Sequence, residues 1–227
     1  MTTKIHNIDH VGEIYAVHFT PDGKMIVGGE EGFFVFGENL NEIWHNAERI
    51  ASVATLPDGN LVTQNLSSND ITIYNGKAIL RTWHVKPMEF CNIIVHEDLS
   101  RILIPAESQN KILVYDLHGG LDFIIFPNMT SPDWICEFDE SHLIITCMHD
   151  DSADSGLVGL FPIDMNSVAL WKTKLDTANA VCYDSANELI IVGGKYCIHI
   201  LSTSGVFKLY NKLKSASLYT IAPISPT

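Results

Sequence analysis

Short apolar runs alternate with turn residues along the whole chain. The stretch from Ile14 to Trp44 contains four such runs, and its turns fall at residues 21–23, 28–32 and 37–41. The runs are rich in Val, Ile, Phe, Tyr and Thr and are too short for helices, which need ten or more residues. The pattern therefore predicts a unit of four short strands joined by three tight turns.

The four-strand unit recurs four more times. Pro57-Asp58-Gly59 repeats Pro21-Asp22-Gly23 after 36 residues, and a later run, 189–194, repeats the apolar-Gly-Gly pattern of residues 25–29. A period near 40 residues is typical of a β-propeller, so residues 1–227 are predicted to form one all-β domain. The predicted four-strand units cover residues 14–46, 50–84, 90–126, 133–172 and 179–212. The aromatic residues that end the outer runs are interpreted as packing anchors between neighbouring sheets: Trp44, Trp83, Trp171 and Tyr210.

Two short segments remain at the ends of the chain, at residues 3–8 and 217–222. The second lies in a stretch that resembles the start of the first unit. These segments either add to the first and last blades of a five-blade ring or pair with each other as a slim sixth blade, because a propeller must protect its edges. We favour five four-stranded blades, since about 45 residues per blade then accounts for the whole chain.

Composition indicates a compact acidic protein. Hydrophobic residues make up 46% of the chain and charged residues 18%, which suits a folded core. The formal net charge of −13 opposes contact with nucleic acid or with anionic membrane surfaces. The N-terminus lacks the apolar segment of a signal peptide, and no run approaches the ~20 residues of a membrane helix. The five cysteines lie inside apolar runs, which indicates buried, reduced thiols in a cytoplasmic protein: Cys91, Cys136, Cys147, Cys182 and Cys197.

The residues also resemble a known family. The run from Val17 to Gly29, followed by Phe33 to Phe36, resembles the repeat of tryptophan-aspartate (WD) propellers and related proteins. Residues 112–116 resemble the segment that ends in that family's namesake pair, with Tyr115 in place of tryptophan and Asp116 retained. The resemblance implies a rigid disc that binds other proteins and needs no cofactor.

Two features are candidate binding elements. The acidic loop between the second and third strands of the fourth unit carries Asp150, Asp151 and Asp154. Calcium would need a bidentate glutamate late in this loop, but the twelfth position is Phe161, so we predict a contact loop without a metal. Trp134 begins an inner strand, where it either stacks on a ligand or packs within the fold.

The inner strands of a propeller line its central channel. His18, Glu137 and Cys182 are therefore expected to face one cavity, where they could bind a metal or act as acid and base. An enzymatic alternative, a hydrolase or lyase, would use residues from this set: His18, His96, Glu137 and His142. A lectin-like binder is a further alternative. We favour a non-catalytic scaffold for protein–protein interaction, with no catalytic residue, metal or cofactor assigned.

Overall fold

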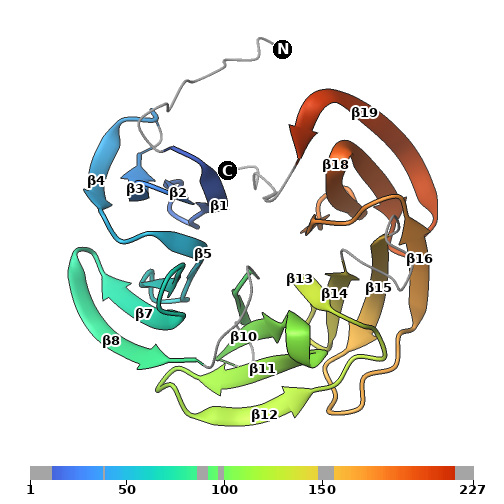
Figure 1. The fold of residues 1–227 in the computed structure, drawn as a ribbon, viewed down its shortest axis with the longest axis horizontal. Helices are drawn as coiled ribbons and strands as arrows, with labels where there is room; N and C mark the ends of the chain where they lie inside the picture. The colour runs from blue at the N-terminus through green and yellow to red at the C-terminus, as the bar shows by residue number, and fades with distance from the viewer. Residues whose placement is uncertain (1–11, 38, 86–91, 97–99, 148–155, 218–227) are drawn as a thin grey trace.

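The computed structural model describes residues 12–217 except 38, 86–91, 97–99 and 148–155, and it places the side chains as far as residue 213. The described chain forms five antiparallel sheets arranged around a central axis (Figure 1). This is a five-blade β-propeller, as the repeat predicted. The predicted terminal strand at 3–8 lies outside the described residues, and so does the one at 217–222 beyond Ser217.

Four blades have four strands each, paired in chain order. The first has β1 (Ile14–Phe19), β2 (Met25–Gly29), β3 (Gly32–Phe36) and β4 (Glu42–Asn46). The second has β5 (Ile50–Thr55), β6 (Leu61–Asn65), β7 (Asp70–Asn75) and β8 (Ala78–His84). The third has β9 (Ile94–His96), β10 (Arg101–Ala106), β11 (Lys111–Asp116) and β12 (Leu121–Ile125). The fourth has β13 (Pro132–Asp139), β14 (His142–Cys147), β15 (Gly156–Pro162) and β16 (Trp171–Leu175).

The fifth blade has the same plan in three elements: β17 (Ala180–Asp184), β18 (Leu189–Ser202) and β19 (Phe207–Ser217). The first part of β18, residues 189–193, pairs with β17, and residues 197–201 pair with β19. Between these parts Tyr196 has a φ of 63°, a left-handed conformation suited to a turn. The 14 residues of β18 thus supply the second and third strands of the blade.

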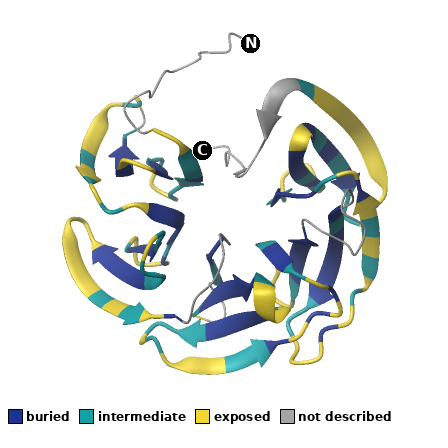
Figure 2. Ribbon diagram, in the orientation of Figure 1, coloured by how far each residue is buried: buried dark blue, intermediate teal, exposed yellow. Residues whose placement is uncertain are grey.

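Hydrophobic clusters fill the spaces between successive blades. One cluster joins β1–β3 to β5–β7 around Phe33, Ile50 and Tyr74, and three similar clusters join the second blade to the third, the third to the fourth and the fourth to the fifth. Figure 2 shows the consequence: the second and third strands of the blades are largely buried, and the outer strands are more exposed. Strands buried on both faces need apolar side chains at almost every position, which explains their continuous apolar sequences.

Two of the outer aromatic residues anchor one blade on the next. A Cβ at Gly119 would lie 2.8 Å from the Trp83 ring, and a Cβ at Gly205 would lie 2.5 Å from the Trp171 ring. The Trp171 indole also donates a hydrogen bond to the carbonyl of Thr203 at 3.0 Å. Each tryptophan therefore packs against the glycine of a turn in the following blade, where a side chain would not fit.

Trp44 packs against the ring of Phe33 in its own blade and against the cluster that Phe33 shares with the second blade. A cavity of about 410 Å³ lies beside Trp44 between these two blades. Tyr210 contacts the His199 ring in its own blade and is 49% exposed. Its role as an anchor between sheets stays a prediction.

Two strands do not begin where the apolar runs of the sequence indicate. The apolar run at residues 168–171 indicates a strand, but β16 begins at Trp171. The cause is a backbone contact between blades: residues 165–167 bond to the chain at 126–128 instead of continuing the blade. In the third blade the run at residues 91–95 indicates the inner strand, whereas β9 covers Ile94–His96 and residue 91 lies outside the described residues.

Substitution of the turn glycines should separate packing from backbone strain. Gly205 and Gly59 both have positive φ, but no atom lies within 4 Å of a Cβ built on Gly59. Gly59→Ala should cost only the left-handed backbone, about 1–2 kcal/mol. Gly205→Ala should lose about 1–3 kcal/mol more, because the methyl group overpacks the Trp171 ring. Urea unfolding of both variants measures the difference, and equal losses would contradict the anchor.

Candidate functional site

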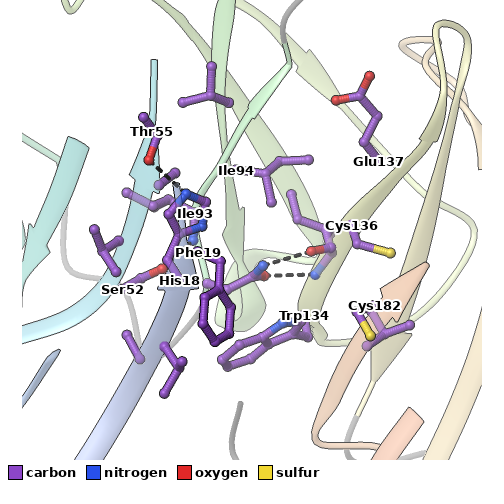
Figure 3. Close-up of a pocket in the computed structure, with 18 of the residues that line it drawn as sticks. His18, Phe19, Ser52, Thr55, Ile93, Ile94, Trp134, Cys136, Glu137 and Cys182 are labelled. Atoms are coloured by element: carbon purple, nitrogen blue, oxygen red, sulfur yellow. Dashed lines mark hydrogen bonds between the residues drawn. The ribbon is translucent and has the colours of Figure 1, made fainter. Parts of the chain in front are cut away.

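The inner strands of all five blades surround a central cavity of about 370 Å³ (Figure 3). Its wall is mainly apolar and includes the aromatic rings of Phe19 and Trp134, which Figure 3 shows on the same side of the cavity. The polar or sulfur-containing side chains in the wall come from several blades: His18, Ser52, Thr55, Asn92, Cys136, Glu137 and Cys182.

Three ionisable side chains occupy the same position in their blades. His18 on β1, Cys136 on β13 and Cys182 on β17 lie opposite an isoleucine of the following strand: Ile26, Ile144 and Ile191, respectively. Because side chains alternate between the two faces of a strand, a shared register gives the three groups a shared direction. The repeat itself therefore brings them to one cavity.

Polar side chains connect each inner strand to the next. His18 Nε2 lies 2.7 Å from the hydroxyl of Thr55, which joins β1 to β5. The hydroxyl of Ser52 accepts a hydrogen bond from the backbone N–H of Ile93 at 2.8 Å, which joins β5 to the chain entering β9. These contacts replace the backbone ladder that the described inner strands of separate blades do not share.

The same connection continues toward the fifth blade. The buried Asn92 amide donates to the carbonyl of Ile135 and accepts from its N–H, both at 2.7 Å. Further along β13, the Cys136 thiol receives a hydrogen bond from the backbone N–H of Tyr183 in β17. Side chains thus tie five successive inner strands into one circumferential chain.

Burial favours the neutral forms of three ionisable groups of the cavity, His18, Cys136 and Cys182. Loss of water lowers the pKa of His18 to about 4 and raises the pKa of Cys182 to about 12. The pKa of Cys136 is also raised well above its usual value, again mainly by burial. At neutral pH the cavity wall therefore carries an uncharged imidazole and two thiols rather than an imidazolium and thiolates.

The structure brings some of the predicted site residues together. Trp134 and Glu137 line the cavity with His18. His96 is fully buried, and its Nε2 lies 3.9 Å from Oε1 of Glu137. His142 instead begins β14 near the hairpin turn, where its Nδ1 lies 2.8 Å from a carboxylate oxygen of Asp139, outside the set that lines the cavity.

The three predicted residues of the acidic loop, Asp150, Asp151 and Asp154, lie outside the described residues. Sequence reasoning missed the polar residues that join the blades, together with the aromatic residue at the cavity. Ser52, Thr55 and Asn92 each have apolar neighbours on both sides, but such positions match no chemical motif. Phe19 lies in the first apolar run and carries no signal that separates it from a core residue.

Two kinds of feature are absent from the described residues. No group of three or more His, Cys, Asp or Glu side chains in this part of the chain is placed to hold a metal ion. The same residues include no helix with the length and apolar character needed to cross a bilayer.

Solved structures with the same fold share little sequence with this chain. Hydrazine synthase of Kuenenia stuttgartiensis aligns with a TM-score of 0.71 at 14% identity, over 94% of this chain and 69% of that one. A protein of unknown function from Desulfotomaculum acetoxidans gives 0.67 at 15%, over 87% and 69%. The WD40 β-propeller domain of Doa1 gives 0.69 at 13%, over 92% and 71%. No family model and no curated protein matches the sequence. The similarity to these solved structures therefore shows the fold alone.

Removal of the Asn92 amide should destabilise the ring. Asn92→Ala leaves a buried N–H and a buried carbonyl of Ile135 without their partner, which should cost about 2–4 kcal/mol of unfolding free energy. The matched control is Asn187→Ala, because Asn187 is exposed and bonds only within its own turn to Asp184. Its cost should stay within about 0.5 kcal/mol. Chemical unfolding measures both, and a similar loss in the two variants would refute the structural role of Asn92.

The lowered pKa of His18 predicts acid sensitivity. Its folded pKa of about 4 lies below the unfolded value of 6.5, so the unfolded chain binds the proton more readily between these values. The stability that neutral His18 allows is therefore present above pH 6.5 and is lost as the pH falls toward 4. Between pH 7 and about pH 4.5 the wild type should lose about 2 kcal/mol more than His18→Gln, which does not titrate. Parallel losses in urea titrations of the two proteins would contradict this assignment.

Proposed function

We propose that this propeller is a non-catalytic scaffold for protein–protein interaction, and that its central cavity receives an apolar side chain of a protein partner. The observation that carries this proposal is the chemical character of the cavity. Its wall is mostly apolar, and burial keeps the imidazole and the two thiols uncharged.

The cavity has the size and lining of a binding site. Its volume of about 370 Å³ lies within the range of known ligand pockets. Phe19 is partly exposed at the cavity and Trp134 lies in the same wall. Aromatic side chains next to a desolvated pocket are frequent energetic centres of protein interfaces. These features support insertion of a partner's hydrophobic residue.

The imidazole of His18 and the two thiols of the cavity are poorly suited to catalysis. A cysteine nucleophile needs a depressed pKa, because the thiolate is the reactive form, and both thiols here are shifted in the opposite direction. A general base works best with a pKa near the operating pH, which the value of about 4 for His18 does not provide. We also place the protein in the cytoplasm, where these free thiols would stay reduced.

The similar structures bear on the choice between a scaffold and an enzyme only through the fold that they share with this chain. We propose kinship with WD-type propellers, which the similarity to the Doa1 domain supports. Hydrazine synthase is an enzyme by name, so a catalytic alternative stays open. One contact favours it: Glu137 faces the cavity and lies 3.9 Å from His96, an arrangement that could transfer a proton. Elemental analysis of the purified protein tests its metal-dependent form, which requires a stoichiometric metal ion.

Peptide selection tests the scaffold proposal directly. Peptides with a central aromatic or aliphatic residue should be enriched from a random display library by the wild-type protein. Phe19→Ala should weaken their binding by about tenfold, because loss of one interface aromatic commonly costs more than ~1 kcal/mol. Isothermal titration calorimetry with one selected peptide measures this change.

The control variant is Met165→Ala, since Met165 is 57% exposed in the loop before β16, away from the cavity. It should bind the selected peptide as the wild type does. Peptides that bind both variants with wild-type affinity, or a failure to select any peptide, would overturn the proposal.

A further inference from the structure

β19 differs from the outer strands of the other four blades. It has 11 residues, whereas β4, β12 and β16 have five and β8 has seven. It also stands at the end of the strand order in its sheet, so its outer edge offers backbone N–H and carbonyl groups. Natural proteins usually keep such edges short or cover them. The length of β19 therefore sets it apart as a place where another strand can pair.

Apolar side chains are exposed along this edge. Phe207, Leu209 and Tyr210 on β19 are each about half exposed, and Val206, just before the strand, is 61% exposed. Figure 2 shows the exposed colour running along the described part of β19. Neighbouring apolar side chains that are exposed on a folded protein often mark an interaction site. Their exposure on β19 therefore indicates an interaction surface.

Charge is segregated at the same edge. The chain has no Asp or Glu after residue 188, whereas this last part contains Lys195, Lys208, Lys212 and Lys214. The net charge of −13 thus divides into +4 for residues 189–227 and −17 for residues 1–188. Lys208 and Lys212 are exposed on β19 itself. The part of the fifth blade that contains β19 is therefore basic, whereas the preceding part of the chain is acidic.

We infer that β19 is a docking edge for an acidic, extended segment of a partner protein, which adds to the fifth blade as a further strand. The inference deepens the proposed scaffold function by naming the chemistry of a partner, and it concerns a surface separate from the central cavity. Main-chain hydrogen bonds to β19 would supply affinity, and the lysines would select acidic residues. The exposed apolar side chains would pack against alternate residues of the added strand.

The charges favour this occupant over two others. A second copy of the chain pairing through its own β19 would bring the lysines of both strands to one edge, where like charges repel. A nucleic acid would meet the −17 charge of the remaining blades, which opposes a phosphate backbone. An acidic peptide segment is small enough to contact the basic edge alone.

A peptide of about ten residues that alternates glutamate with valine is the probe, because this length matches a long strand. Fluorescence anisotropy should show binding to the full-length protein that weakens as salt rises. Lys208→Glu/Lys212→Glu should weaken binding by about tenfold, since each exposed ion pair contributes up to ~1 kcal/mol. The matched control Lys77→Glu/Lys111→Glu makes the same charge change on the second and third blades and should stay within about twofold of the wild type.

Two further probes separate strand addition from charge attraction. The same peptide with alternate backbone nitrogens methylated keeps its charge but loses hydrogen-bond donors, so it should not bind. Equal binding of the methylated peptide, of a lysine–valine peptide, or of a single-stranded oligonucleotide would overturn the inference. Unchanged binding by the Lys208→Glu/Lys212→Glu variant would overturn it as well. Phe19→Ala should bind the glutamate–valine peptide normally, so failure at β19 is distinguishable from failure of the cavity proposal.

Discussion

Side-chain hydrogen bonds between inner strands hold the centre of this propeller together. No backbone ladder joins the described inner strands of separate blades, which leaves side chains to link neighbouring blades at the axis. His18, Ser52 and Asn92 make these connections at distances of 2.7–2.8 Å. Hydrophobic clusters fill the space between blades, but they are not directional. The polar contacts add the geometry that fixes one inner strand relative to the next.

The same constraint shapes the cavity. Because the polar groups of the cavity wall are bonded to neighbouring strands, much of their hydrogen-bonding capacity is used in contacts between blades. His18 illustrates the point: its ring is bonded to Thr55, and burial favours its neutral form. His18, a candidate catalytic residue in the sequence, thus links two neighbouring blades through its hydrogen bond to Thr55. The apolar positions between such polar groups form much of the cavity wall.

Much of the fold followed from local patterns. The Pro-Asp-Gly turns and the short β-branched runs have direct physical signals, so the blades and their order could be predicted. The start of β16 could not, because residues 165–167 bond to the preceding blade, and such a contact leaves no mark in the local sequence. The links through Ser52 and Asn92 were hidden for a similar reason. The role of a single polar residue in an apolar run can be assigned only when its hydrogen-bond partner, which is distant in the sequence, is known. The charge segregation at β19 was readable from the sequence, but its importance depends on the strand being a long edge.

The boundaries between blades are not equally stiff. The Trp171 ring fills the space over Gly205, and the third and fourth blades share backbone hydrogen bonds between residues 126–128 and 165–167. Beside Trp44, in contrast, a cavity of about 410 Å³ separates parts of the first two blades. Atoms bordering such a space have fewer contacts to resist displacement. A load applied across the disc will therefore be resisted least where such contacts are fewest: beside Trp44, and at the boundary between the fifth and first blades, which no hydrophobic cluster of the described residues spans.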